Sequence, residues 1–408
     1  MSISRLQRIY MLNTTDLAEG KLVATYRQDQ NIIPEMFSPM TANDCYNLAL
    51  KLYENGDYLY AIEWFSESLD KLERMGGNQT YPFTAIEIIE RIEKTIELFE
   101  VIIGYKDFMT ELYIWITKIY NFFNGNDKNV IRSPYYTIFD DFRDSVLLMN
   151  RYTELCRGTT NISLTTTSNL HCSYLKTNTF LSIAPIKMEE LHKDPDIYLF
   201  HEVLSDNEIE ILKEMASPKL RRATTTLDED GTFIPYYLFD ARIGKNAWLF
   251  SSNNIIPRVI ERDTVDIVSD RTADFTGMSM THTEPLQVLN YGIAGHYVMH
   301  YDTESNKDRK YLETTGDRIA TVLFYMSDVS QGGATVFPRL QLAVKPKKGT
   351  AIYWMNLCPS GERDGRMLHA ACPVLFGDKW VSNSWIHEAG QELKKPCGLL
   401  QDTSEQLT

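Results

Sequence analysis

The feature that most constrains the fold of this chain is a series of short, strand-like segments in its second half. They are rich in β-branched and aromatic residues, are separated by turn residues, and read in order PLQVLNYG, HYVMHYD, RIATVLFYMSD, ATVFP, LAVKPKKG, TAIYWMN, HAACPVLFG and KWVSNSWIHE. Short strands at near-regular spacing are typical of an all-β sandwich or barrel. Two amphipathic helical patterns, DNEIEILKEMA and IPRVIERDTVDIVSDRTA, precede them. Residues 190–408 are therefore predicted to form a β-barrel domain flanked by helices.

A candidate metal site lies in one of these segments, HYVMHYD. Residues two apart in a strand point to the same side, so His300 and Asp302 are expected to face the same way. An aspartate inside a barrel is costly unless it is paired or bound to a metal. His369, on a later predicted strand, supplies a third ligand. Two histidines and one carboxylate form the facial triad of non-haem Fe(II) oxygenases, which leaves positions open for a 2-oxo acid and dioxygen.

A cation for the distal carboxylate of the 2-oxo acid is available at Lys379. This lysine opens the segment KWVSNSW after a Gly-Asp turn, and a lysine flanked by tryptophan and valine on such a strand needs an anionic partner. An H-x-D pair alone is common by chance. The combination of that pair with His369 and Lys379 on strands of one barrel indicates a 2-oxoglutarate-dependent oxygenase.

The first part of the chain has a helical pattern. Residues 1–40 are interpreted as the remnant of a helical segment followed by a loop. Thr41 is a candidate N-cap for ANDCYNLALKLYENG, which returns through a Gly-Asp turn as YLYAIEWFSESLDKLERM. This hairpin has the length of one tetratricopeptide unit, and a second hairpin with a poorer signature follows. Residues 41–125 are therefore predicted to form a tetratricopeptide-like domain, and residues 126–189 a connector.

Charge and hydropathy exclude several function classes. The formal net charge of −14 repels phosphate backbones and no local basic patch is evident, so nucleic acid is not expected as a partner. No apolar run is long enough to span a bilayer. The N-terminal residues MSISRLQRIYMLNTTD lack the apolar core and cleavage site of a secretory signal, which by itself predicts a cytosolic protein.

The cysteines leave the compartment open. Cys156 and Cys172 lie close together in sequence, as do Cys372 and Cys397, and such pairs are typical of proteins that fold in an oxidising compartment. Buried thiols are the alternative interpretation of the same spacing, and the spacing alone does not decide between the two.

Taken together, these segments resemble the α subunit of collagen prolyl 4-hydroxylase. The resemblance is carried by HYVMHYD, GDRIATVLFYMSDVSQGGATVFP, VKPKKGTAIYW and HAACPVLFGDKWVSNSWIHEAGQE, and it is close to continuous from about residue 190 to Cys397. Upstream, TANDCYNLALKLYENGDYLYAIEWF resembles the peptide-substrate-binding domain of that family. The resemblance implies an α+β multidomain protein, in which a tetratricopeptide-like α-helical domain precedes a double-stranded β-helix (jelly-roll) catalytic domain with flanking helices.

Roles in binding the metal and the cosubstrate follow from the resemblance. It implies that iron is held by the three residues His300, Asp302 and His369, and that Lys379 anchors 2-oxoglutarate. It places two further residues in the cosubstrate pocket, namely Tyr291 and Thr321. Core packing is the alternative interpretation of Tyr291.

Roles in binding the substrate follow in the same way. Three residues match positions near the peptidyl proline, namely Tyr297, Arg318 and Trp385. Tyrosines of the first helical hairpin match positions that grip a proline-rich peptide, namely Tyr53, Tyr58 and Tyr60. The family's disulfides would carry over as Cys156–Cys172 and Cys372–Cys397. Core packing of Trp385 and a surface ion pair at Arg318 are the alternatives.

Three departures from the family limit what the resemblance implies. The secretory signal and the long N-terminal dimerising segment of the family are missing from this sequence. The second helical hairpin has lost much of the tyrosine pattern that grips polyproline II peptides, so the peptide need not be collagen. Val298 and Met299 stand where the family usually has Glu-Pro.

The predicted activity is that of a procollagen-proline 4-dioxygenase, which hydroxylates peptidyl proline to 4-hydroxyproline and decarboxylates 2-oxoglutarate to succinate and CO2. The resemblance implies Fe(II), 2-oxoglutarate, O2 and L-ascorbate as cofactors, protein disulfide isomerase as a β subunit, and the endoplasmic reticulum lumen as location. Three alternatives stay open. A non-catalytic peptide-binding paralogue is disfavoured by the intact ligands, and a cupin-type metalloprotein by Lys379. A related dioxygenase acting on a non-collagen, proline-rich peptide is the third.

Overall fold

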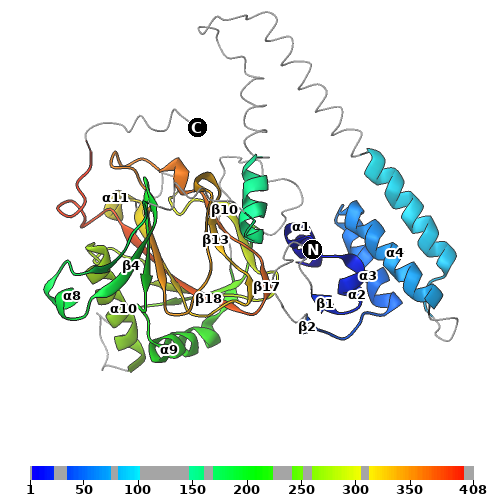
Figure 1. The fold of residues 1–408 in the computed structure, drawn as a ribbon, viewed down its shortest axis with the longest axis horizontal. Helices are drawn as coiled ribbons and strands as arrows, with labels where there is room; N and C mark the ends of the chain where they lie inside the picture. Colours follow the sequence, from blue (N-terminus) through cyan, green and yellow to red (C-terminus); the bar gives the residue numbers. More distant parts are fainter. Residues whose placement is uncertain are drawn as a thin grey trace, which may run out of the picture. The chain divides into compact units, whose positions relative to one another are not determined.

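The computed structural model describes residues 2–22, 35–74, 81–101, 147–159, 169–223, 241–250, 260–304 and 312–398. The chain divides into two compact units, one spanning Met1–Asn150 and the other containing Arg151–Ile234 and Asp240–Thr408 (Figure 1). Residues 85–101 of the expected second helical hairpin are helical, and the rest of that hairpin lies outside the described residues. No helix in the described ranges is long and apolar enough to cross a bilayer.

The centre of the first unit is a helical hairpin. Helix α3 (Ala42–Glu54) begins after Thr41, whose side chain accepts a hydrogen bond from the backbone N–H of Asp44 while the Asp44 carboxylate accepts one from the backbone N–H of Thr41. This reciprocal capping box satisfies two backbone donors that the first turn would otherwise leave unpaired. Helix α4 (Tyr58–Arg74) returns along α3, and their apolar faces meet in a core that contains the fully buried residues Ala49, Leu52, Ala61, Trp64 and Phe65.

The N-terminal residues belong to this helical unit. Helices α1 (Ser2–Tyr10) and α2 (Thr14–Ala18) contact α4. The Trp64 Nε1–H donates to Gln7 Oε1 at 2.9 Å, and Lys71 pairs at 2.7 Å with Glu19, the C-cap of α2. The strands β1 (Lys21–Leu22) and β2 (Glu35–Met36) follow. The described helices of residues 1–40, which the sequence suggested are a helical remnant, are thus tied to the hairpin by polar contacts.

Within its described residues, the second unit contains two main antiparallel sheets and one two-stranded sheet. The larger has the order β3 (Cys172–Leu175), β4 (Ile186–Lys193), β5 (Asp196–His201), β15 (Ala351–Met355), β11 (Arg318–Tyr325), β18 (Lys379–His387), β9 (Leu286–Tyr291), β8 (Lys245–Leu249), β6 (Arg221–Arg222). The smaller has the order β14 (Leu342–Val344), β13 (Thr335–Phe337), β16 (His369–Ala371), β10 (His296–His300), β7 (Arg242–Ile243). A short pair joins β12 (Gln331–Gly332) to β17 (Val374–Phe376). Each strand-like segment identified in the sequence contains one or two of these strands.

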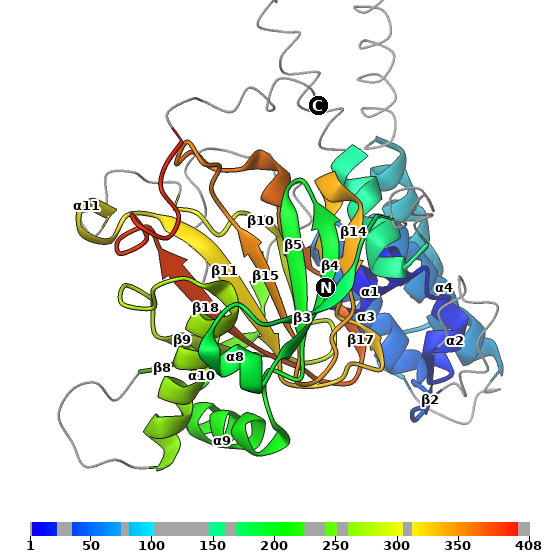
Figure 2. The same ribbon diagram turned by 60° about the vertical axis from the view of Figure 1, so that its left-hand side comes forward.

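Side chains alternate across the large sheet and so build two cores. On β11, Val322 and Phe324 face the core shared with helices α9 (Asp206–Ala216) and α10 (Ile260–Thr276), whereas Leu323 and Tyr325 face the smaller sheet. Figure 2 shows α8 (Thr179–Ile183), α9 and α10 along one side of the large sheet. The candidate site residues lie on the other side, between the two sheets.

The disulfide pairing differs from the one implied by the resemblance. Cys156, in the helical residues 151–157, is bonded to Cys372 across a Cα–Cα distance of 5.5 Å. Cys172 lies instead on the edge strand β3 opposite Glu189, and Cys397 is exposed near the end of the described chain. The pairings Cys156–Cys172 and Cys372–Cys397 are therefore wrong in this structure. Cys372 directly follows β16, where it meets the helix that carries Cys156.

Phe65→Ala should destabilise the helical unit and leave the catalytic unit folded. Phe65 is completely buried, so its truncation is expected to lower the free energy of unfolding of that unit by about 3–5 kcal/mol. Denaturant unfolding followed by circular dichroism should resolve the change, and Leu59→Ala, at a position that is 46% exposed, is the matched control. If Phe65→Ala also abolished Fe(II) binding, the division of the chain into two units would be contradicted.

Candidate active site

Two neighbouring strands of the smaller sheet bring the three expected metal ligands together. His300 ends β10 and His369 begins β16, and the two are register partners in an antiparallel pair. Asp302 follows β10 by two residues, and its Oδ1 lies 3.6 Å from the Nε2 atom of each histidine. One ligand atom from each residue lies within 4.8 Å of the others, which is close enough for all three to bind one ion.

The histidines are oriented for metal binding by their other ring nitrogen. His300 Nδ1 lies 2.7 Å from the Val298 carbonyl oxygen, and His369 Nδ1 lies 2.9 Å from the Met367 carbonyl oxygen. A carbonyl can only accept, so each Nδ1 carries the proton and each Nε2 lone pair is directed at the site. Burial, the larger cause, and the neighbouring His300, the smaller one, lower the pKa of His369 to about 4. The His369 ring is therefore neutral at pH 7. This donor set fits Fe(II).

Asp302 is held as a buried carboxylate. Burial alone would raise the pKa of Asp302, but the imidazoles of His369 and His300 and the Arg318 guanidinium lower it well below its usual range. The Thr321 hydroxyl donates to Asp302 Oδ2 at 2.7 Å, and Thr321 in turn accepts from Asn356 Nδ2 at 2.9 Å. Thr321 was expected in the cosubstrate pocket; its hydrogen bond orients the metal ligand.

Aromatic rings fix the planes of the two histidines. The Tyr297 ring stacks on His300 at 3.5 Å between centroids, and the Arg242 guanidinium lies over Tyr297 at 4.7 Å. Trp354 packs edge-on against His369 at 5.0 Å. Burial raises the pKa of Tyr297 to about 12, so its hydroxyl stays neutral at any physiological pH.

Lys379 places a buried amine between the two sheets. Its residue exposure is 1%, and its Nζ lies 5.8 Å from the Tyr291 ring centroid and 5.9 Å from the Tyr325 ring centroid. Burial lowers the pKa of Lys379 to about 7. Gly333 lines the lysine stem, and a Cβ there would stand 3.4 Å from Lys379 Cδ. A buried amine with aromatic walls is suited to an anionic ligand, because a carboxylate would compensate the cost of burying the charge.

Arg318 and Trp385 form a second polar cluster beside Asp302. Arg318 donates to both carboxylate oxygens of Glu284, lies 4.0 Å from the Trp385 ring centroid, and donates to the Asp302 backbone carbonyl at 3.1 Å. Glu284 also accepts from His387 Nε2 at 3.1 Å. Burial alone would lower the pKa of His387, but its hydrogen bond to Glu284 raises it above the ordinary value. Arg318 thus forms a partly buried ion pair with Glu284.

Several residues of this site were not singled out from the sequence. His387 could have been found, because it continues the alternation of Lys379 and Trp385 along β18. Glu284, Asn356 and Arg242 lie in separate segments, and no local pattern joins them to the site.

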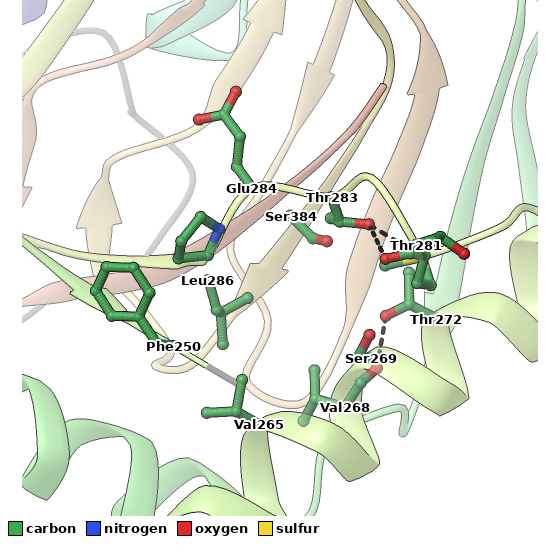
Figure 3. Close-up of a pocket in the computed structure, with 12 residues that line it drawn as sticks. Phe250, Val265, Val268, Ser269, Thr272, Thr281, Thr283, Glu284, Leu286 and Ser384 are labelled. Carbon is green, nitrogen blue, oxygen red and sulfur yellow. Dashed lines mark hydrogen bonds between the residues drawn. The ribbon is translucent and has the colours of Figure 1, made fainter. Parts of the chain in front are cut away.

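A cavity of about 340 Å3 lies behind the large sheet, on its helix side. Figure 3 shows Val265 and Val268 of α10 facing Leu286 and Ser384 across it. The Glu284 carboxylate points away from these residues, toward the Arg318 and His387 cluster. None of the three metal ligands lines this cavity, so it is separate from the metal centre.

Comparison with known proteins gives the class and the family. The model of the 2OG-Fe(II) oxygenase superfamily matches residues 286–387. Prolyl 4-hydroxylase subunit alpha-2 of Caenorhabditis elegans is 34% identical over 434 residues, which cover 99% of this chain and 73% of the relative. Human prolyl 4-hydroxylase subunit alpha-1 is 34% identical over 431 residues, which cover 98% of this chain and 74% of the relative. The solved viral collagen prolyl hydroxylase of Paramecium Bursaria Chlorella virus-1 is 26% identical and covers 47% of this chain and 95% of that chain, with a TM-score of 0.37.

The second unit is thus an oxygenase of the 2-oxoglutarate- and Fe(II)-dependent class, with a ligand triad at the smaller sheet and a buried lysine on the larger one. The two relatives match nearly the whole chain and not the oxygenase segment alone. The chain belongs to the prolyl 4-hydroxylase α-subunit family.

Binding of 2-oxoglutarate should take up a proton above pH 7. Without the ligand, Lys379 has a pKa of about 7 and is mostly neutral at pH 8, whereas the bound dianion stabilises the ammonium form. The affinity is therefore expected to fall as the pH rises, by up to about tenfold per pH unit. Calorimetric titration at pH 8 in buffers of different ionisation enthalpy measures the uptake.

Lys379→Arg is the matched control for this titration, because a guanidinium stays charged throughout the range. The variant should bind 2-oxoglutarate without proton uptake at pH 8. If the unmodified chain also binds without uptake, the lysine does not titrate as the structure predicts.

Proposed function

We propose that this chain hydroxylates peptidyl proline at C4 in a proline-rich or collagen-like peptide, with oxidative decarboxylation of 2-oxoglutarate to succinate and CO2. The single observation that carries the proposal is that the metal ligands and Lys379 border one side-chain cluster. Phe337 and Trp354 of this cluster pack on His369, and Tyr291 and Tyr325 flank Lys379. The identity to prolyl 4-hydroxylase α subunits over nearly the whole chain supports the choice of proline. In finer terms, we assign the catalytic unit to the jelly-roll class and the helical unit to the tetratricopeptide-like class.

The protein positions the metal and the cosubstrate, supplies a charge that binds the cosubstrate, and excludes water from the site. Fe(II), held by His300, Asp302 and His369, would supply the chemistry that activates dioxygen. Lys379 holds the distal carboxylate of 2-oxoglutarate and so fixes the direction in which the oxo acid enters the site. Thr321 and the two backbone carbonyls that accept from the histidines keep the ligands in place. Buried aromatic walls exclude water from the reacting groups.

The peptidyl proline would lie against Tyr297 and the Arg318–Trp385 pair. Tyr297 stacks on His300, so a proline that contacts this ring is held close to the metal. The Arg318 guanidinium is fixed by Glu284 and by the Asp302 carbonyl, and can orient a peptide carbonyl without further ordering cost. These three residues are the proposed catalytic-site contacts to the substrate.

The helical unit would bind a more distant part of the same peptide. Tyr53 and Tyr58 pack edge to face at 5.5 Å, and Tyr60 lies under the Arg8 guanidinium at 5.7 Å. Tyr46 stacks on Phe83 at 4.1 Å and adds aromatic surface that the sequence did not indicate. Aromatic grooves hold stiff polyproline II segments with little entropy loss.

The compartment and the partner are also proposals. A disulfide between Cys156 and Cys372 supports folding in an oxidising compartment, which for this family is the endoplasmic reticulum lumen. Protein disulfide isomerase is the proposed β subunit, and L-ascorbate the proposed reductant for iron that has become oxidised.

Replacing any of the three metal ligands with alanine, in His300→Ala, Asp302→Ala or His369→Ala, should abolish hydroxylation. Loss of groups that merely support metal ligands costs 10–100-fold, so loss of a ligand should cost more than about 100-fold in turnover. Succinate release with a panel of proline-rich peptides measures turnover, and equilibrium dialysis measures Fe(II) binding. His282→Ala, at an exposed position, is the control. Near-normal hydroxylation in one ligand variant would remove that residue from the site.

The triple variant Tyr53→Ala, Tyr58→Ala and Tyr60→Ala should weaken binding of long proline-rich peptides by roughly tenfold, because it removes the aromatic wall of the helical unit. Turnover of a short peptide should be unchanged, since the chemistry lies in the other unit. Calorimetric titration of the full chain with (Pro-Pro-Gly) repeats tests the first part, with Tyr174→Ala in the catalytic unit as the control. Unchanged affinity of the triple variant for the long peptide would show that these tyrosines do not form the groove.

A further inference from the structure

Asp302 presents its two carboxylate oxygens to different neighbours. Its Oδ1 lies 3.6 Å from the Nε2 atoms of His300 and His369, on the metal side. Its Oδ2 accepts the Thr321 hydroxyl at 2.7 Å. A carboxylate can bind a cation through one oxygen or through both. The partner of Oδ2 therefore influences how many positions of the ion are left open for the cosubstrates.

A chain of three hydrogen bonds leads from Trp354 to this second oxygen. The Trp354 Nε1–H donates to Asn356 Oδ1 at 2.8 Å, and Asn356 Nδ2 donates to Thr321 Oγ1 at 2.9 Å. Thr321 then donates to Asp302. Strand pairing brings the donors together, because Thr321 of β11 is the register partner of Trp354 on β15, and Asn356 lies two residues further along on the same side. All four residues are buried.

The two ends of the chain fix the direction of every hydrogen bond in it. An indole N–H can only donate, so the atom of Asn356 that faces Trp354 is the carbonyl oxygen. The amide N–H of Asn356 is thereby turned toward Thr321, whose own hydroxyl proton is left for Asp302. The ionised carboxylate at the other end can only accept. Hydrogen bonds aligned in this way strengthen one another in a buried site.

We propose that Asn356 is a positioning residue of the metal centre. Its amide, oriented by Trp354, keeps the Thr321 hydroxyl on Oδ2 of Asp302 and so reserves Oδ1 for the metal ion. Without this amide the Thr321 hydroxyl is free to rotate to another acceptor, and Oδ2 is free to bind the ion as well. The inference deepens the proposed function and rests on it, because it takes Fe(II) to be the ion held at this site.

A double-mutant cycle on Fe(II) binding tests whether Asn356 acts through Thr321. Asn356→Leu and Thr321→Val should each weaken Fe(II) binding roughly tenfold, measured by equilibrium dialysis of the full chain without peptide. The double variant should also lose roughly tenfold, because its second change removes a link that is already broken. Asn207→Leu, at an exposed position on α9, is the matched control and should bind Fe(II) normally. Additive losses, or normal binding by Asn356→Leu, would overturn the proposal.

Trp354→Phe provides the same test if Asn356→Leu does not fold. This variant keeps an aromatic ring beside His369 and removes the N–H that orients the Asn356 amide. Fe(II) binding should weaken by up to roughly tenfold, and the effect should be absent when Thr321 is already valine. A loss of equal size in the Thr321→Val background would show that Trp354 acts only by packing, which would overturn the proposal.

The Co(II)-loaded chain gives a readout that does not depend on affinity, because the visible absorption of Co(II) reports how many ligand atoms surround the ion. Asn356→Leu, Thr321→Val and the double variant should share one altered spectrum, since Oδ2 of Asp302 is released in all three. Asn207→Leu should keep the spectrum of the unmodified chain. An unaltered spectrum in Asn356→Leu would overturn the proposal alone, whereas failure of the unmodified chain to bind either metal would overturn the proposed function with it.

Discussion

The ionised carboxylate of Asp302, buried between two sheets, is the interaction on which the catalytic unit depends. Its exposure is 6%, and an isolated buried carboxylate would be strongly unfavourable. Two imidazoles, the Thr321 hydroxyl and the nearby Arg318 compensate part of this cost. The remainder is what a divalent cation would provide, so the site is arranged to bind one.

The strand pairing explains how such a cluster is held without a loop of unusual shape. The antiparallel register of β10 and β16 sets His300 opposite His369, and the chain leaving β10 adds Asp302. The register of β18 with β9 sets Lys379 opposite Tyr291, facing the same space. Rigid sheets thus fix the metal ligands and the cosubstrate anchor independently, while Arg318 joins the two sheets through the Asp302 carbonyl. Preorganised ligands of this kind reduce the cost of binding each cosubstrate.

The strands, their two-residue alternation and the ligand set could all be predicted from the sequence, because each depends on local pattern. The roles of Thr321 and Arg318 were less accessible, since their partners Asp302 and Glu284 come from segments that are distant in sequence. The disulfide was misassigned for the same reason: closeness in sequence did not reveal that the helix carrying Cys156 reaches the end of β16. The contacts of α1 and α2 with α4 rest on buried polar pairs such as Gln7 and Trp64, which hydropathy patterns do not report.

The most direct test of this account is to follow both atoms of dioxygen during turnover. The chain would be incubated with Fe(II), 2-oxoglutarate, a proline-rich peptide and heavy-oxygen-labelled dioxygen, and the products analysed by mass spectrometry. The account predicts one labelled atom in 4-hydroxyproline, one in succinate, and CO2 in equal amount. Hydroxyproline without label, or no succinate from the Fe(II)-loaded chain, would contradict the assignment of this site as a 2-oxoglutarate-dependent oxygenase.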